Sequence, residues 1–458
     1  MDESDVMVVF GITGDLAKLM TLKSLYLLQA RGILTQQVVG VAFDDWTLDQ
    51  LKDHARECIS AAGVTIDEQV FEQFCDKLLY VSGDFSDPAT YARVAEAIKG
   101  ATSPLFYLEV PPALFGTVVE GLHGAGLTDN ARVVLEKPFG HDLKSAEELN
   151  ETLHKLLDES QIFRIDHFLG KMSVEDILYL RFANTLLDPV WNRHYVSSVQ
   201  VTMAENLDVS DRGSFYDANG TLRDVVQNHL LQVLAMVAME PPAGRSPEVI
   251  NDRKADVFRA MPDAKPANSV RGQYKGYLDV KGVKPDSTTE TYIALRLEVD
   301  NWRWSGVPFF IRSGKCLPEK VTEVRLVFKQ APPMLFAKGE RKLPPNQIII
   351  RIDPNAGSSI TLHARDADDS GTREIHLDMD FDDEGGDGPT PYEELLSAAL
   401  RGDHTDFTRE DSVEETWRIV QPLLDHPAPI EVYDPGTWGP AGADELIRHW
   451  GGWHQPWM

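Results

Sequence analysis

The first third of the chain repeats one alternation of segments. Short apolar runs, typical of buried strands, are separated by stretches with helical spacing, as in residues 14–30, where leucines recur on one face. The apolar runs occupy residues 6–10, 38–41, 78–81, 105–108 and 133–135. Strands that alternate with helices favour a parallel sheet covered on both faces, and right-handed crossovers make it a doubly wound, Rossmann-type domain.

The pattern changes from about residue 195 onward. Alternating or continuous apolar runs are now joined by short loops, which predicts a large, mostly antiparallel sheet. These runs occupy residues 199–203, 292–299, 307–312, 324–328, 348–352 and 360–363. One long helical run, residues 220–240, ends at Pro241-Pro242. We therefore predict an α/β Rossmann domain over residues 1–166 and an α+β domain with the large sheet over residues 167–458.

Composition agrees with two domains and narrows the class of protein. A chain of 458 residues is too long for one ordinary core, and its 43% hydrophobic and 25% charged residues are typical of soluble proteins. The longest apolar runs are too short for a transmembrane helix, and the acidic N-terminus is unlike a signal peptide. Three cysteines form neither a disulfide framework nor a metal-binding spacing. A cytoplasmic protein is expected.

The net charge of −28 bears on possible partners. An acidic protein repels the phosphates of nucleic acid, so nucleic-acid binding is not expected, and neither is a membrane partner. An anionic small molecule needs a local cationic pocket, which screening beyond roughly 10 Å makes feasible.

One short segment, residues 163–171, carries a carboxylate, an imidazole and an ammonium group. If the segment is helical, His167 and Lys171 are four residues apart and share a face that suits an anion such as a phosphoryl group. Asp166 then points elsewhere and can orient a second residue. Taken alone, the segment is described equally well as a surface helix with an internal Asp/Lys pair.

A glycine-containing loop follows the first predicted strand and opens the first helix. Gly11, Gly14 and Ala17 form a variant of the common dinucleotide-binding spacing. Glycines let the backbone approach a pyrophosphate, and N–H groups at a helix start bind its oxygens. A tight strand-to-helix turn without a ligand is the alternative interpretation.

Five segments, in this order and at these separations, resemble the glucose-6-phosphate dehydrogenase family. They are residues 6–18, 136–140, 163–171, 223–229 and 310–315, and the resemblance runs from about residue 6 to past residue 440. It implies oxidation of C1 of glucose 6-phosphate to 6-phosphogluconolactone with hydride transfer to NAD or NADP, the entry step of the oxidative pentose phosphate pathway. It also implies a homodimer or homotetramer.

The resemblance assigns roles to individual residues. His229 is the general base, although read alone it is a satisfied core histidine, and Asp166 holds its tautomer. The substrate-binding residues implied are His167, Lys171, Glu205, Asp224, Lys315, Lys320 and Lys137. The cofactor-binding residues implied are Gly11, Thr13, Gly14, Asp15, Leu16, Phe43, Asp44 and Lys137. No metal is expected.

The chain departs from the family at the end of the second strand. Family members that use NADP carry an arginine there, whereas this chain has Phe43 followed by Asp44 and Asp45. An acid at this point receives the ribose 2′-hydroxyl of NAD and repels a 2′-phosphate, by about 1 to 4 kcal/mol at roughly 4 Å. We therefore expect NAD to be preferred. The alternative is that both acids are solvated and another basic residue contacts the 2′-phosphate.

Two further departures concern the substrate. Phe168 stands where the family usually has a tyrosine, so one phosphate hydroxyl is missing and weaker phosphate affinity is expected. Met20 replaces a lysine that lies near cofactor and substrate.

These departures keep other functions open. A dehydrogenase for a related sugar phosphate is one alternative, and a non-catalytic, nucleotide-binding regulatory relative is another; the presence of His229 and Asp166 argues against the latter. A general Rossmann sugar dehydrogenase does not explain residues 166–171. The tail, with Trp450, Trp453 and Trp457, packs either on its own sheet or on a neighbouring subunit.

Overall fold

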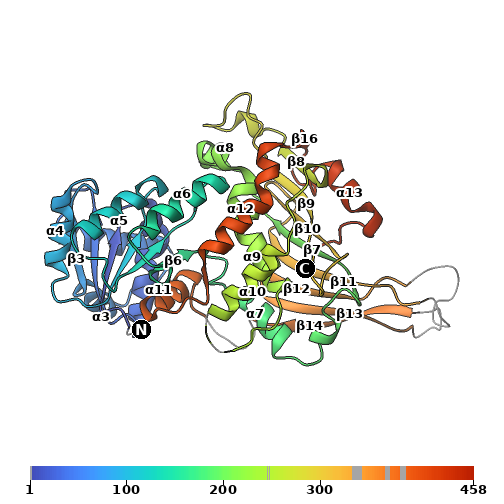
Figure 1. Cartoon of the computed structure of the whole chain (residues 1–458), viewed down its shortest axis with the longest axis horizontal. Helices are drawn as coiled ribbons and strands as arrows, with labels where there is room; N and C mark the ends of the chain where they lie inside the picture. The colour runs from blue at the N-terminus through green and yellow to red at the C-terminus, as the bar shows by residue number, and fades with distance from the viewer. Residues whose placement is uncertain are drawn as a thin grey trace. The chain divides into compact units, whose positions relative to one another are not determined.

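The computed structural model describes residues 3–244, 246, 248–332, 343–366, 372–381 and 388–457 (Figure 1). The chain forms two compact units. Unit 1 consists of Met1–Lys171, Gly244–Asn251 and Pro389–Glu414. Unit 2 consists of Met172–Ala243, Asp252–Gly388 and Glu415–Met458.

Unit 1 is built on a seven-stranded sheet in the order β15-β6-β5-β4-β1-β2-β3. Its strands are β1 (Val6–Phe10), β2 (Gln37–Ala42), β3 (Leu78–Ser82), β4 (Pro104–Leu108), β5 (Arg132–Leu135), β6 (Ile162–Ile165) and β15 (Phe407–Thr408). All neighbours pair in parallel except β15, which is antiparallel to β6. The strand order of β1 to β6 is that of a dinucleotide-binding domain, so the predicted Rossmann architecture is confirmed.

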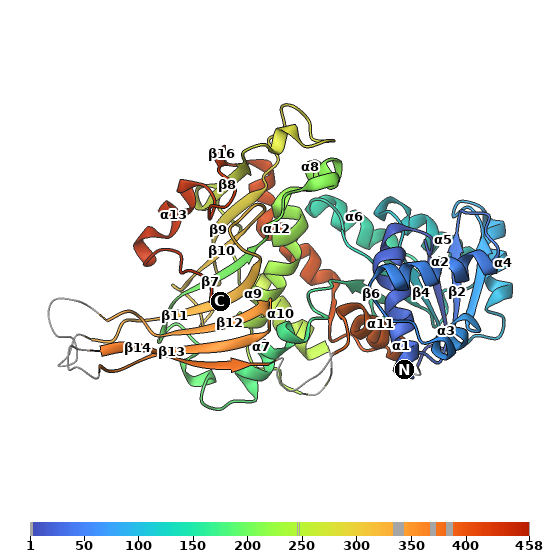
Figure 2. The same ribbon diagram turned by 180° about the vertical axis from the view of Figure 1, so that it is seen from behind.

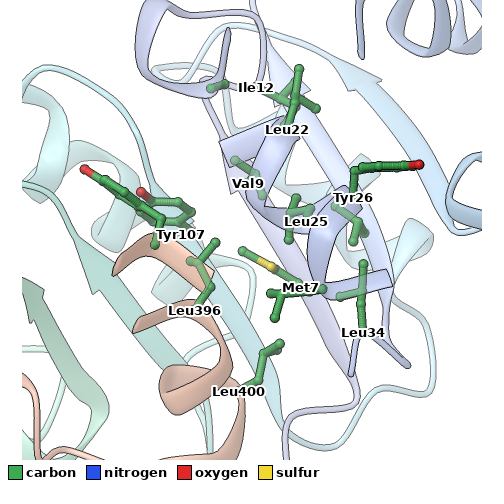
Figure 3. Packing of buried hydrophobic residues seen from close by; sticks show 14 of the residues in the cluster. Met7, Val9, Ile12, Leu22, Leu25, Tyr26, Leu34, Tyr107, Leu396 and Leu400 are labelled. Atoms are coloured by element: carbon green, nitrogen blue, oxygen red, sulfur yellow. The ribbon is translucent and has the colours of Figure 1, made fainter. Parts of the chain in front are cut away.

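Helices cover both faces of this sheet. One face packs against α1 (Leu22–Ala30), α2 (Leu48–Ala61), α3 (Glu68–Cys75) and α11 (Pro391–Arg401). The other packs against α4 (Pro88–Ala97), α5 (Phe115–Gly124) and α6 (Leu143–His154). Figure 3 shows Leu396 and Leu400 of α11 reaching the same apolar cluster as Met7 and Tyr107 of the sheet.

The segment Pro389–Glu414, which contains α11 and β15, belongs to unit 1, although residues of unit 2 separate it in the sequence from the rest of that unit. The predicted division into residues 1–166 and 167–458 includes neither this return nor that of Gly244–Asn251. The apolar face of α11 is visible in the sequence, but that face does not specify which sheet it covers. Contacts between residues far apart in the sequence determine which sheet α11 covers.

Unit 2 contains a nine-stranded sheet in the order β14-β13-β12-β11-β7-β10-β9-β8-β16. Its strands are β7 (Val196–Ala204), β8 (Ser269–Tyr274), β9 (Tyr292–Glu298), β10 (Pro308–Gly314), β11 (Val321–Phe328), β12 (Gln347–Asp353), β13 (Gly357–Arg365), β14 (Thr372–Asp380) and β16 (Ile430–Tyr433). Two neighbour pairs, β7 with β10 and β8 with β16, are parallel and the others antiparallel. The predicted large, mostly antiparallel sheet is confirmed.

The predicted helix over residues 220–240 is present with an irregular beginning. A π-helix, η6 (Leu222–Leu230), runs into α9 (Leu231–Ala238), and Gly220 breaks the path from α8 (Gly213–Thr221) with a φ of +69°. Further α-helices are α7 (Met172–Phe182), α10 (Glu248–Arg259), α12 (Glu410–Asp425) and the short α13 (Ala441–Ile447). Among the described residues, none of the helices has the length and apolar character needed to cross a bilayer.

The tryptophan-rich tail packs on the sheet of its own chain. The guanidinium of Arg312, on β10, lies 4.5 Å from the ring centroid of Trp438 and 4.6 Å from that of Trp453. Phe309, three residues before Arg312 in the same strand, contacts the Trp304 ring. The Trp304 indole N–H donates to the Ala238 carbonyl of α9. Successive residues of a strand point to opposite faces, so the tail and α9 cover opposite faces of β10. Figure 2 shows α13 beside β8 and β9, where it leads into the tail.

Candidate active site

The predicted site residues of unit 1 gather at one edge of its sheet. Gly11, Phe43, Lys137 and Asp166 each follow the carboxyl end of a parallel strand, namely β1, β2, β5 and β6. Carboxyl ends of parallel strands share an edge, and ligands of open α/β sheets bind beyond that edge. Unit 1 therefore has the layout of a nucleotide-binding half-site.

The glycine loop has a geometry that only glycine allows at its first position. Gly11 has a φ of +92°, and a Cβ there would lie 2.3 Å from the Glu109 carbonyl oxygen. The Gly14 N–H donates to the Gly11 carbonyl at 2.8 Å, and a helix begins at Asp15. The first N–H groups of a helix have no intrahelical acceptor, so those of Asp15 and Leu16 can bind a phosphate.

The acid after β2 is tied to this loop. The Thr13 hydroxyl donates to Asp44 Oδ2 at 2.7 Å, and the Tyr80 hydroxyl donates to the Asp44 carbonyl at 2.6 Å. Burial, reinforced by the charges of Asp44 and Asp45, raises the pKa of Tyr80 to about 12, so its hydroxyl stays a donor. The Phe43 side chain is 75% exposed. Asp44 is thus held beside the predicted phosphate loop.

A basic residue also lies on this side of unit 1. Burial lowers the pKa of His54 and the charge of Lys18 lowers it further, which places that ammonium group near His54. The His54 ring meets Trp46 edge to face at 5.1 Å. Lys18 is therefore one basic residue that could contact a 2′-phosphate if Asp44 does not exclude one.

Beneath the loop lies a buried pair of carboxyl groups that the sequence did not reveal. Glu109 follows β4 and accepts a hydrogen bond from the Thr21 hydroxyl, while Glu136 follows β5 and accepts one from the Tyr107 hydroxyl at 2.7 Å. Burial, opposed by these hydrogen bonds, raises the pKa of Glu109 to about 8 and that of Glu136 to about 7. Tyr392 of α11 also hydrogen-bonds to Glu136.

Two sequence features near this edge take definite positions. The Lys137–Pro138 peptide bond is cis. Met20, which replaces a lysine of the family, is partly buried and packs against the apolar cluster of unit 1.

The segment after β6 is a turn rather than a helix, so the helical premise for residues 163–171 is wrong. Asp166 Oδ1 accepts the Phe168 N–H at 3.0 Å, and the Leu169 N–H donates to the Asp166 carbonyl at 2.9 Å. The Lys171 ammonium lies 4.3 Å from the Phe168 ring centroid, and the His167 ring lies 5.4 Å from it. His167 and Lys171 therefore border the same phenyl ring instead of sharing one face of a helix.

In unit 2, one parallel strand pair brings two predicted residues together. Ala204 at the end of β7 pairs with Gly314 at the end of β10, so the residues that follow, Glu205 and Lys315, leave the sheet side by side. They form an ion pair, and the Leu317 N–H binds the Glu205 carbonyl at 2.9 Å. A carboxylate and an ammonium group in contact can bind neighbouring hydroxyls of one sugar.

Tyr216 of α8 lies beside the Glu205–Lys315 pair, and it was not predicted from the sequence. Its ring centroid lies 5.4 Å from the Lys315 ammonium, and its hydroxyl shares a 2.8 Å hydrogen bond with Thr221. Burial raises its pKa well above the usual value, and the charges of Asp224 and Glu205 contribute. Those two carboxylates therefore lie near Tyr216. A lone tyrosine in a helix gives no signal of this role.

The remaining predicted residues of unit 2 differ in their surroundings. His229 is buried in η6, and Asp224 in the same element is half-buried. The Lys320 side chain is 60% exposed and pairs with Asp353 at 3.0 Å, at the far end of the loop that begins with Lys315.

One group in unit 1 has the spacing of a metal site. Ligand atoms of His154, Glu159 and Glu410 lie within 4.8 Å of one another. Glu159 also pairs with Arg164 at 2.7 Å, so its charge is already balanced. The expectation that the reaction needs no metal stays a prediction.

Comparison with known proteins places both units in one family. The family model for the glucose-6-phosphate dehydrogenase NAD binding domain matches residues 8–176, and that for the glucose-6-phosphate dehydrogenase C-terminal domain matches residues 178–457. Glucose-6-phosphate 1-dehydrogenase 1 of Mycobacterium tuberculosis is 54% identical over 455 residues, which are 99% of this chain and 97% of the relative.

Solved structures agree over the whole length. A glucose-6-phosphate 1-dehydrogenase from Mycobacterium avium has a TM-score of 0.93 at 54% identity, covering 99% of this chain and 100% of that one. A glucose-6-phosphate dehydrogenase in complex with its substrate, glucose 6-phosphate, has a TM-score of 0.91 at 34% identity, covering 99% of both chains. The resemblance inferred from five sequence segments is confirmed: this chain belongs to the glucose-6-phosphate dehydrogenase family.

Proposed function

We propose that this protein oxidises C1 of glucose 6-phosphate to 6-phosphogluconolactone, with hydride transfer to a nicotinamide dinucleotide, as the entry step of the oxidative pentose phosphate pathway. The observation that carries the proposal is identity of 54% over 99% of the chain to a glucose-6-phosphate 1-dehydrogenase, with the predicted base and its acidic partner both present. A dehydrogenase acting on a related sugar phosphate is the closest alternative.

Unit 1 fits the dinucleotide. The close approach of Gly11 to the Glu109 backbone and the helix start at Asp15 form a cradle for a pyrophosphate, which a side chain at Gly11 would fill. When bound, the dinucleotide supplies the hydride acceptor. The other cofactor contacts proposed are those of Thr13, Gly14, Leu16, Phe43, Asp44 and Lys137.

His229 is proposed to take the proton of the C1 hydroxyl as the hydride leaves C1. A histidine suits this because its unperturbed pKa lies near neutral pH. Asp166 is proposed to hold the imidazole in the productive tautomer and to stabilise it once it is protonated. The two electrons of the C–H bond leave as hydride, the proton goes to His229, and C1 becomes the lactone carbonyl.

The sugar phosphate is proposed to be held at both ends. His167 and Lys171, which border Phe168, would bind the phosphoryl group through charge-assisted hydrogen bonds. Sugar hydroxyls would be bound by Glu205 and Lys315, which form an ion pair in the structure. Asp224, Lys320 and Lys137 complete the proposed set.

The cofactor preference is proposed to be for NAD. Its support is the Thr13–Asp44 hydrogen bond, which holds a carboxylate beside the phosphate loop where a 2′-phosphate would otherwise lie. We also propose that the protein is a homodimer or homotetramer, on the basis of the family; sedimentation velocity measures this directly.

Turnover with a panel of sugar phosphates tests the function. We expect the purified protein to reduce the dinucleotide with glucose 6-phosphate at a kcat/KM at least tenfold above that with fructose 6-phosphate, mannose 6-phosphate or glucose. Faster turnover of another sugar phosphate would move the assignment to that substrate. Dinucleotide binding without turnover of any sugar would support the non-catalytic alternative.

A further inference from the structure

The element that carries Asp224 and His229 has an uncommon geometry. η6 is a π-helix over Leu222–Leu230, and the Leu231 N–H donates to the Val226 carbonyl five residues back. Wide turns of this kind are rare and are frequently found at functional sites. The structure therefore contains a long stretch of backbone that α-helical propensity alone does not explain.

The wide turn changes which residues share a face. In an α-helix, about 100° per residue would leave Asp224 and His229, five residues apart, roughly 140° from each other. In a π-helix, hydrogen bonds join residues five apart, so the side chains of such residues lie on one face, as those four apart do in an α-helix. The Asn228 side chain follows this register, since it donates to the Arg223 carbonyl at 3.2 Å. The π register thus aligns the proposed base with a proposed sugar-binding carboxylate.

The start of η6 is held by one buried side chain, Glu290. Its Oε1 accepts the Leu222 N–H at 3.0 Å, and its backbone carbonyl accepts the Thr221 N–H at 3.1 Å. Gly220 makes room for it, because a Cβ at Gly220 would lie 2.5 Å from Glu290 Oε1. The first turn therefore begins against a fixed acceptor.

Glu290 is in turn fixed by an arginine. Arg271 of β8 donates to Glu290 Oε2 from Nε at 3.2 Å and from Nη2 at 2.8 Å, and also binds the carbonyls of Thr288 and Ala428. Glu290 is 5% exposed and stands just before β9, in the sheet of unit 2. The chain of contacts runs from the sheet through Arg271 and Glu290 to the first N–H of the π-helix.

We propose that Glu290, held by Arg271, is a positioning residue for the reaction: it fixes the first turn of η6 in the π register so that Asp224 and His229 face the sugar together. This inference rests on the proposed function, which gives those two residues their roles. Glu290 itself touches neither substrate nor cofactor in this account.

A carboxylate suits this task for two reasons. It is an acceptor at a helix N-terminus, where negative charge is favoured. It also balances Arg271, so the pair remains neutral while buried. The alternative is that Glu290 only stabilises the fold. A control therefore needs another buried acid with the same kinds of hydrogen bond, at a place away from η6.

Glu323 provides that matched control in the same unit. It is 3% exposed, accepts hydrogen bonds from Arg325 at 3.0 and 3.2 Å, and accepts the Trp457 N–H at 2.9 Å. Like Glu290, it is a buried acid with one arginine and one backbone N–H. Its hydrogen bonds, however, run to Arg325 of β11 and to the Trp457 N–H of the tail, so it holds the tail on the sheet rather than the start of η6.

The experiment compares Glu290→Ala, Glu290→Gln and Glu323→Ala in the full chain. We expect Glu290→Ala to lower kcat/KM for glucose 6-phosphate about 100-fold, the usual effect of a small misplacement of reacting groups, with KM for the dinucleotide within about twofold of wild type. Glu290→Gln keeps an oxygen acceptor for Leu222 and should recover activity to within about tenfold of wild type. Glu323→Ala should lower the melting temperature while kcat/KM changes by less than about threefold.

Hydrogen exchange adds a readout that does not depend on turnover. Amides of residues 222–230 should exchange faster in Glu290→Ala than in wild type or Glu323→Ala. If Glu290→Ala does not fold, Gly220→Ala, which displaces the Glu290 carboxylate, takes its place with the same expectations.

The possible outcomes distinguish failure of the positioning role of Glu290 from failure of the proposed function. A wild-type protein that turns over glucose 6-phosphate, with Glu290→Ala and Glu323→Ala equally active, overturns the positioning role alone. A wild-type protein with no activity on any sugar phosphate overturns the proposed function and this inference with it.

Discussion

The two units build their candidate half-sites by different means. In unit 1, the predicted residues follow the carboxyl ends of parallel strands, and all of these strands except β6, which precedes Asp166, were expected from apolar runs in the sequence. In unit 2, Glu205 and Lys315 meet through one parallel pairing in a mostly antiparallel sheet, and the proposed base, His229, lies in a π-helix. Local signals locate the first half-site, whereas the second depends on strand pairing and buried contacts that no local pattern specifies.

The largest effect is expected at the base in unit 2. His229→Asn removes the proposed proton acceptor while keeping a side chain of similar polarity, so kcat should fall about 100- to 10,000-fold. KM for glucose 6-phosphate should change little, because the base contributes mainly in the transition state. Steady-state kinetics with purified variant measure both values. Retention of more than a tenth of kcat would remove His229 from the mechanism.

The phosphate end in unit 1 should show the next largest effect. Lys171→Ala removes a charge-assisted contact worth about 1.5 to 3 kcal/mol, so KM for glucose 6-phosphate should rise roughly 10- to 100-fold. Lys320→Ala is the matched comparison, because the Lys320 side chain is 60% exposed and already paired with Asp353. Its effect should be smaller, and equal effects would show that exposure does not separate the two lysines.

Cofactor choice tests a third feature, again in unit 1. Asp44→Ala removes the carboxylate beside the phosphate loop and leaves Lys18 in place, so the ratio of kcat/KM for NAD over NADP should fall about tenfold. Thr13→Val keeps the carboxylate but loses its hydrogen bond and should shift the ratio less. If the ratio of kcat/KM for NAD over NADP is unchanged in Asp44→Ala, the two acids after β2 are solvated and do not determine cofactor choice.

The smallest effect concerns stability rather than activity. Glu109 and Glu136 have pKa values of about 8 and about 7 in the folded protein, above their usual value of 4.5. The folded state therefore binds more protons than the unfolded chain between about pH 5 and 8, and its stability falls as the pH rises through that window. Glu109→Gln should flatten this dependence in thermal melts from pH 5 to about pH 9. A slope identical to that of wild type would contradict the assignment.

The same contrast explains what the sequence could predict. Five strands of unit 1 and six of unit 2 were expected because apolar runs are local. Strands β6, β8, β14, β15 and β16 and the returning helix α11 were not expected, because their local sequence patterns do not specify the strands or the sheet with which they pack. The register of η6 was also missed, since a π-helix depends on Gly220 and on Glu290, 70 residues later in the sequence.

The roles of the candidate site residues came from the resemblance to the family, because the residue types alone do not indicate them. His229 in a helix reads as core, and Lys315 reads as a surface charge, until family membership assigns them roles. The structure then added Tyr216 and Glu290, whose importance lies in contacts rather than in residue type. It also showed that residues 163–165 end β6 and residues 167–170 form a turn rather than a helix, in which Asp166 Oδ1 accepts the Phe168 N–H.

The central claim is the proposal that Asp166 and His229 act in the same proton transfer. A double-mutant cycle of Asp166→Asn, His229→Asn and both together tests it through kcat/KM for glucose 6-phosphate. The account predicts strong non-additivity, with the double variant no worse than about threefold below His229→Asn alone, because Asp166 acts only through the imidazole. Additive losses would contradict it and would give Asp166 a role independent of His229.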